Sequence, residues 1–196
     1  MCSSAQHGGR SSRARAAAVL AALAVLTACG TATQTVLPQG QSAATESGRP
    51  DSDTPTSTSE VDVEKGGGEP VLVKGVRFTA HDTYDRVVVD FDGDVPGYNA
   101  KWVDELVEDG SGEPIDVHGG AYLQVTLFPA DAHDERGEPT WKGGPIYPAN
   151  LRNLAGVVRT GDFEGRVGIG LVLNRRAAFQ VKEQGPPNRL TVDVAH

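Results

Sequence analysis

The 196-residue chain contains little cysteine, few aromatic residues and fewer basic than acidic side chains. Its two cysteines, Cys2 and Cys29, lie within the first thirty residues, so the rest of the chain has no disulfide scaffold and no cysteine-based metal site. The 18 basic and 26 acidic side chains give a formal net charge of -8. Because an acidic surface repels phosphate, this charge argues against nucleic-acid binding and against adsorption to anionic lipid through a basic patch.

Complete catalytic and cofactor-binding motifs are also missing. The sequence has no Gly-x-Ser-x-Gly nucleophile elbow, no His-Glu-x-x-His zinc motif and no glycine-rich phosphate loop. The segment Asp90–Asp94 resembles the start of a calcium loop, but its sixth position is Val95 and its twelfth is Lys101. We therefore predict a noncatalytic protein without a cofactor or a bound metal.

The only long apolar run, Ala16–Leu26, follows three arginines and no acidic residue. As a helix it would span about 16 Å, too short to cross a bilayer but typical of the apolar region of an export signal. Directly after it, Leu26-Thr27-Ala28-Cys29-Gly30 resembles the bacterial lipobox, which directs lipid transfer to the cysteine thiol and cleavage just before it. We predict that residues 1–28 are a lipoprotein signal peptide and that Cys29 is lipidated. Cleavage there leaves 15 basic and 26 acidic side chains, a net charge of -11.

Residues 29–68 are dominated by Ser, Thr, Gly, Gln, Ala and Pro, with almost no large apolar side chain after Leu37. Such a segment buries too little apolar surface to offset the entropy of ordering the chain. The composition therefore predicts a disordered tether between Cys29 and a domain that begins at Glu69. A truncation near Glu69 is expected to leave the stability of that domain unchanged.

Residues 69–196 show apolar side chains with a period of two, as at Val87, Val89 and Phe91. This alternation is typical of half-buried strands, and no helical stripe of ten or more residues interrupts it. We predict an all-β fold, an antiparallel β-sandwich of about eight or nine short strands. A change of phase at Gly75 predicts a β-bulge in the first strand. The candidate strands are Val71–Thr79, Val87–Phe91, Tyr98–Val107, Ile115–Val117, Leu123–Leu127, Leu154–Thr160, Val167–Leu173, Ala178–Lys182 and Leu190–Val194.

Four aromatic residues are candidate ligand-binding residues, because exposed rings stack on sugar faces and on peptide side chains. These are Tyr98, Trp102, Trp141 and Tyr147. Two of them, Trp141 and Tyr147, flank a glycine-rich loop from which they are expected to project.

Histidine and carboxylate side chains leave a catalytic alternative open. If His81, Asp85 and His133 converged, they would provide the ligands of a metal-dependent hydrolase. The strand parity, however, turns Asp85 inward, where Arg86 or backbone N–H groups must satisfy its charge. A structural role is therefore predicted for Asp85.

A set of separate motifs spreads over residues 69–196: Val76, Arg77, His81, Tyr84–Val88, Phe91, Pro96–Tyr98, Asp109–Gly112, Pro129, Ala130, Ala132, His133, Gly161–Gly165 and Asn188–His196. Through these motifs the segment resembles the AMIN-like domain of bacterial, chiefly actinobacterial, lipoproteins. This resemblance implies a β-sandwich related to AMIN domains, which accompany cell-wall amidases and secretins and are thought to target them to peptidoglycan or the envelope.

Together these observations predict an exported lipoprotein, held at the outer face of the cell membrane by its lipid alone. Its domain is expected to be a noncatalytic binding module for peptidoglycan or a wall-associated partner. Two alternatives remain: an inhibitor or assembly factor that docks on another envelope protein, and the metal-dependent hydrolase.

Overall fold

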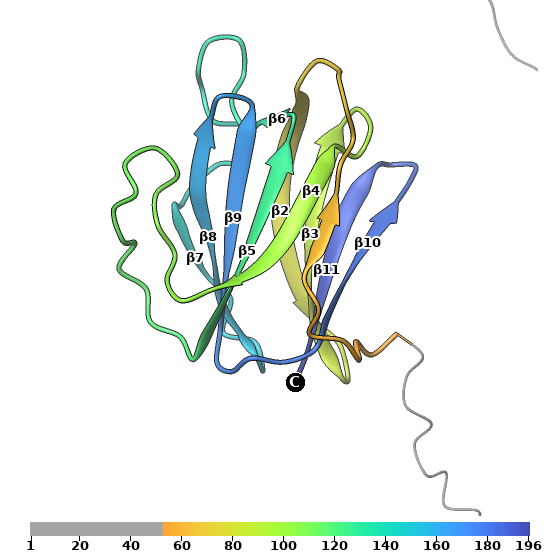
Figure 1. The fold of residues 1–196 in the computed structure, drawn as a ribbon, viewed down its shortest axis with the longest axis vertical. Helices are drawn as coiled ribbons and strands as arrows, with labels where there is room; N and C mark the ends of the chain where they lie inside the picture. Colours follow the sequence, from red (N-terminus) through yellow and green to blue (C-terminus); the bar gives the residue numbers. More distant parts are fainter. Residues whose placement is uncertain (1–52) are drawn as a thin grey trace, which may run out of the picture. The chain divides into compact units, whose positions relative to one another are not determined.

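The structure is a computed structural model that describes residues 53–196, which form eleven β-strands and no helix (Figure 1). Within this range no helix is present that has the length and apolarity to cross a bilayer. The predicted signal peptide and Cys29 lie outside the described residues. The strands are β1 (Val61–Val63), β2 (Val71–Ala80), β3 (Tyr84–Asp92), β4 (Gly97–Val103), β5 (Ala121–Phe128), β6 (Ala130–Asp131), β7 (Ile146–Pro148), β8 (Leu154–Phe163), β9 (Arg166–Leu173), β10 (Phe179–Gln184) and β11 (Arg189–Ala195).

The strands form two sheets that face each other as a sandwich (Figure 1). The six-stranded sheet has the order β1-β4-β5-β9-β8-β7, and the five-stranded sheet has the order β10-β11-β3-β2-β6. All neighbouring strands are antiparallel except β2 and β6. The predicted all-β fold is therefore confirmed.

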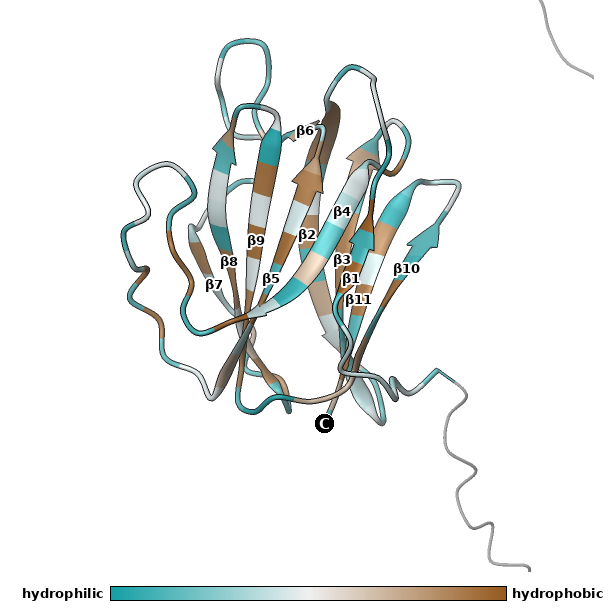
Figure 2. Cartoon of the chain, viewed as in Figure 1, coloured by the Kyte–Doolittle hydropathy of each residue, from teal (hydrophilic) through white to brown (hydrophobic). Residues whose placement is uncertain are grey.

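Alternating apolar side chains build the core between the sheets. In β5, Leu123, Val125 and Leu127 are almost fully buried, and the residues between them are partly exposed. The same alternation colours β5 and β9 in Figure 2. In β9, Gly168 and Gly170 occupy the outward positions. The alternation in the sequence thus indicates which side chains of these strands face the core.

The structure confirms the predicted bulge and corrects the limits of several strands. The register between β2 and β3 shifts between Val73 and Gly75, where the apolar phase changes. Strands β1, β6 and β7 were not predicted, because each has only two or three residues and too few side chains to show a period. The predicted strand Tyr98–Val107 ends at Val103.

The predicted strand Ile115–Val117 does not form, because this segment belongs to a loop that packs on the outer face of the six-stranded sheet. Leu106 of this loop is buried and forms a second apolar cluster with Val158 and Val172. A Cβ on Gly170 would lie 2.5 Å from Leu106, so glycine at this outward position of β9 makes room for the loop.

Part of the predicted tether is ordered, so the expected domain boundary at Glu69 is wrong. Strand β1 pairs with β4, and the backbone N–H of Phe179 in β10 donates a hydrogen bond to the carbonyl of Ser57 at 2.7 Å. The indole Nε1 of Trp102 donates to the carbonyl of Thr58 at 3.0 Å. Residues 53–68 attach through backbone pairing, through ion pairs such as that of Lys65 with Glu183, and through Val61 and Val63, which pack against the core. Two valines in a polar segment were too few for the composition to reveal this order.

Candidate functional site

Two exposed phenylalanine rings lie beside one arginine where β5, β8 and β9 meet. Phe128 ends β5 and is 46% exposed, and Phe163 ends β8 and is 60% exposed. The guanidinium of Arg166 lies 4.5 Å from the centroid of the Phe128 ring, and Arg166 pairs with Phe163 across the β8–β9 hairpin. We call Phe128, Phe163 and Arg166 the aromatic ridge.

Large exposed apolar side chains are rare in the described part of the chain. Besides the two rings of the aromatic ridge there is only Ile146, which is 44% exposed in the edge strand β7. Two of the three such side chains therefore lie together, next to a cation. Clustered exposed apolar groups of this kind mark interaction sites more often than isolated ones do.

Two hollows border the aromatic ridge. One has a volume of about 450 Å³ and is lined by Tyr98, Phe128 and Lys65 among others. The second has a volume of about 320 Å³ and is lined by Phe163. Arg166 lines both hollows, so they adjoin at the aromatic ridge.

The local sequence fixes the aromatic ridge through a tight hairpin. Glu164 and Gly165 join β8 to β9 and both have positive φ angles, 52° and 70°. Two consecutive positive φ values are typical of the type I′ turn, which matches the twist of the flanking strands. The carbonyl of Gly165 accepts a hydrogen bond from the backbone N–H of Ala130 at 2.8 Å, which joins the hairpin to the segment after Phe128.

One of the two cations that line the larger hollow, Lys65, is neutralised within the protein. Lys65 pairs with Glu183 at 2.7 Å and also donates to the carbonyl of Val95. Burial, followed by the nearby Glu183, raises the pKa of Tyr98 above its usual value. No ion pair is found for Arg166 among the described residues, so its guanidinium is available to a carboxylate ligand.

The described residues that line the two hollows include no histidine, cysteine or serine. The histidine, cysteine and serine side chains that most often serve in covalent catalysis are therefore not among the lining residues. Aromatic faces beside a cation instead suit stacking and ion pairing with a ligand.

The four aromatic residues predicted as ligand candidates do not form one surface. Tyr98 is only 8% exposed but lines the larger hollow. Trp141 is 5% exposed and stacks on Tyr147 with 4.7 Å between ring centroids, so its expected projection from the loop is wrong. Trp102 contacts Phe179 edge-on, away from the other three.

The proposed convergence of His81, Asp85 and His133 is also wrong. The carboxylate of Asp85 is fully buried and accepts hydrogen bonds from the backbone N–H groups of Asn153 at 2.7 Å and Leu154 at 2.8 Å. This arrangement confirms the prediction that Asp85 turns inward, and backbone groups satisfy its Oδ2. Its buried Oδ1 has no hydrogen-bond partner among the described residues and lies 3.8 Å from Nε2 of His196.

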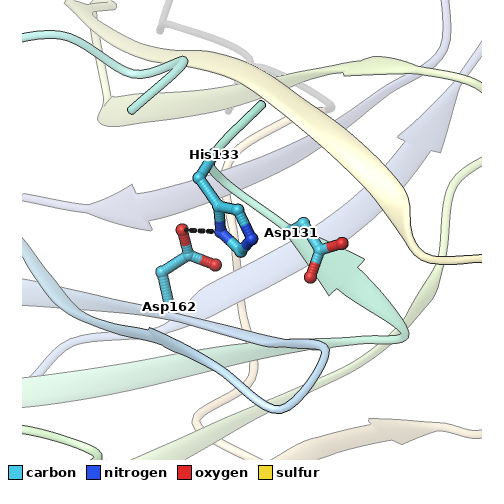
Figure 3. Close-up of side chains that lie close together, drawn as sticks. All are labelled: Asp131, His133 and Asp162. Carbon is cyan, nitrogen blue, oxygen red and sulfur yellow. Dashed lines mark hydrogen bonds and ion pairs between the residues drawn. The ribbon is translucent and has the colours of Figure 1, made fainter. Parts of the chain in front are cut away.

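His133 instead belongs to a group with two carboxylates that the sequence analysis did not connect (Figure 3). Its Nδ1 lies 2.7 Å from Oδ2 of Asp162, and Asp131 lies on the other side of the ring. The hydrogen bond to Asp162 raises the pKa of His133, and burial opposes this effect. Among residues 53–196 this is the single group of three or more side chains with metal-ligand spacing.

The alternation of inward and outward side chains in the sequence indicates that part of the aromatic ridge is exposed. Because Leu123, Val125 and Leu127 face inward, the same alternation turns Phe128 outward. Phe163 directly precedes the Glu164-Gly165 turn, where a side chain lies at the end of the sandwich. Neither signal shows that both rings lie beside Arg166, because that depends on the pairing of β9 with β5 and with β8.

The fold and the hollows together define a class of protein: an all-β sandwich with two hollows beside an exposed aromatic surface. The family model of the AMIN-like domain matches residues 71–196, and the chain belongs to this family. Membership points to a noncatalytic, cell-envelope-related binding module. Strand β1 lies before the matched residues. No curated protein and no solved structure matches the chain.

Proposed function

We propose that this chain is a lipoprotein anchored through Cys29 at the outer face of the cell membrane. In this proposal its β-sandwich is a noncatalytic module that binds peptidoglycan or a wall-associated partner through the aromatic ridge. The observation that carries the proposal is the pair of exposed rings, Phe128 and Phe163, beside Arg166 and between two hollows.

The chemistry of the aromatic ridge suits a ligand that is partly sugar and partly acidic peptide. Aromatic rings stack on the apolar faces of sugars, and an arginine binds a carboxylate through two parallel hydrogen bonds. Peptidoglycan offers both groups, because its glycan strands carry peptides with free carboxylates. The hollows, at about 450 and 320 Å³, fall within the range of small-ligand sites, about 300 to 1,000 Å³.

The overall charge makes a local contact necessary. With a formal net charge of -8, the chain is repelled by anionic wall polymers at long range. Binding to the wall therefore depends on a small surface where aromatic stacking and a single cation act at contact distance. The aromatic ridge is such a surface.

The proposal is tested by cosedimentation of the purified chain with isolated wall sacculi. We expect Phe163→Ser to weaken binding about fivefold or more, because contact residues of this kind contribute about 1 kcal/mol or more. The matched control is Ile146→Ser, which removes another exposed apolar side chain from the edge strand β7 and should leave binding unchanged.

Equal binding by Phe163→Ser and the unmodified chain would contradict the proposed surface. The same variants are then used in a pull-down from solubilised envelope protein. Capture of one protein partner that depends on Phe163, without any binding to sacculi, would assign the aromatic ridge to the inhibitor or assembly-factor alternative.

The proposed anchor is tested by Cys29→Ser. Because lipid supplies nearly all the membrane affinity of an acidic chain, we expect this variant to leave the membrane fraction or to remain an unprocessed precursor. Fractionation followed by mass measurement of the N-terminal fragment distinguishes these outcomes. A processed variant that stays in the membrane would contradict the lipobox interpretation.

A further inference from the structure

We propose that Asp131, His133 and Asp162 bind one divalent transition-metal ion of the zinc type. One ligand atom from each residue lies within 4.8 Å of the other two. Ligands about 2.0 to 2.2 Å from one ion are at most about 4.4 Å apart, so a small rotation of the side chains closes the site. One imidazole nitrogen with two carboxylate oxygens is a donor set that zinc accepts.

A simple ion pair does not account for the whole group. His133 already pairs with Asp162 at 2.7 Å, which leaves the half-buried carboxylate of Asp131 on the other side of the ring (Figure 3). Within the described residues, no hydrogen bond or ion pair reaches that carboxylate, and no lysine or arginine pairs with Asp162. Two carboxylates thus face one imidazole, and a divalent cation would neutralise both.

The backbone already orients one of the ligands. Oδ1 of Asp162 accepts a hydrogen bond from the backbone N–H of Ala132 at 3.0 Å, which fixes the carboxylate plane. Hydrogen bonds of this kind hold metal ligands in position in known metal sites. The carboxylate of Asp162 therefore loses little conformational freedom when an ion binds.

Access and donor type narrow the choice of ion. The side chains of His133 and Asp162 are 40% and 19% exposed, so an ion reaches them from solvent and water completes its coordination. Calcium and magnesium prefer all-oxygen ligands, whereas an imidazole nitrogen favours zinc and related ions.

The site lies next to the aromatic ridge but does not depend on it for its test. Asp162 directly precedes Phe163 in β8, while Asp131 belongs to β6. A bound ion would thus join the β8–β9 hairpin to the segment that follows Phe128. The sequence shows no metal motif because Asp162 lies 29 residues after His133, and only the fold brings them together.

Isothermal titration with Zn²⁺ tests the proposal on the full chain, purified without a polyhistidine tag and stripped with chelator. We expect one site per chain, and we expect His133→Gln and Asp131→Asn each to weaken it at least about tenfold. Both variants keep Cys2 and Cys29, so thiol binding cannot explain the loss. The matched control is His118→Gln, which removes an exposed histidine 3.9 Å from Asp116 and should not change the affinity.

A second measurement uses the unmodified chain, so it does not depend on how a substitution affects the structure around His133. Substoichiometric Mn²⁺ added to the unmodified chain should broaden the NMR signals of residues 131–133 and 162 first. The absence of Zn²⁺ binding, an equal loss with His118→Gln, or broadening spread over other acidic surfaces would each overturn the proposal. Binding to sacculi is not part of either readout, so failure here leaves the proposed function standing.

Discussion

The two ends of the sandwich use charged side chains in opposite ways. At the end where β3 begins and β11 finishes, Asp85 and Asp193 are completely buried. Asp193 pairs with Arg86 through two hydrogen bonds, of 2.5 and 2.8 Å, and Asp85 binds backbone N–H groups. At the other end, Arg166 lies on an exposed phenylalanine ring, without an acidic partner among the described residues.

Under the proposed function, this difference separates stability from recognition within one domain. The run from Tyr84 to Val88 is a dense part of the family resemblance, yet its charged residues are occupied by internal contacts. A buried charge that internal hydrogen bonds hold in place orders the fold, because removing one partner leaves the other unsatisfied. An exposed ring and an unpaired cation remain available to a ligand instead.

The largest effect is expected from Asp85→Ala. Loss of this carboxylate leaves the buried N–H groups of Asn153 and Leu154 without an acceptor, so the free energy of unfolding should fall by about 1 to 3 kcal/mol. Urea denaturation followed by tryptophan fluorescence measures the change.

The control for this variant is Asp92→Ala, which removes an exposed carboxylate 4.0 Å from Lys74 and should change stability by less than about 0.5 kcal/mol. If Asp85→Ala keeps full stability but no longer binds sacculi, the assignment of stability to this end of the sandwich and of binding to the other end is wrong. That result would move the binding site to the buried end.

A smaller effect is expected when residues 53–68 are deleted from the full chain. The deletion removes the β1–β4 pairing and the acceptors of Phe179 and Trp102, so the unfolding free energy should fall by about 1 kcal/mol. Deletion of residues 37–52, which is of equal length, is the control and should have no effect on unfolding. Equal stability of the two deletions would restore the boundary at Glu69.

The smallest effect is expected from Asp109→Asn at the smaller hollow. Burial raises the pKa of the Asp109 carboxyl above 3.8, and a hydrogen bond from Thr160 opposes this effect. The native state thus holds this proton more tightly than the unfolded chain, which favours folding at low pH. That contribution is lost as the pH rises through the folded-state pKa.

Asparagine does not ionise, so Asp109→Asn should gain stability relative to the unmodified chain between about pH 3.5 and pH 7. The gain should stay below about 0.5 kcal/mol, because the side chain remains in contact with solvent. Urea denaturation at both pH values measures it. A difference that does not change with pH would show that ionisation of Asp109 is not the cause.

The sequence was sufficient for those features that depend on local alternation. The inner faces of the long strands, the bulge near Gly75 and the inward turn of Asp85 all follow from side-chain parity. The outward position of Phe128 follows from the same rule, although its significance depends on what lies beside it.

Features that depend on pairing between distant segments were not predictable. The contact between Phe128 and Arg166 requires the β5–β9 register, and the group around His133 requires the hairpin after β8 to meet β6. The order of residues 53–68 rests on pairing with β4 and β10 and on ion pairs with residues far along the chain, which composition does not reveal.

The attachment of residues 53–63 has a mechanical consequence. The side chain of Lys182 and the amide of Gln180, both in β10, contact Asp53, whereas β1 pairs with β4 in the other sheet. A pulling force applied before residue 53 therefore loads β10 first and the β1–β4 ladder next. Because residues 53–63 contact both sheets, tension on the chain is transmitted to both of them. The two sheets therefore resist the force together before either one unfolds.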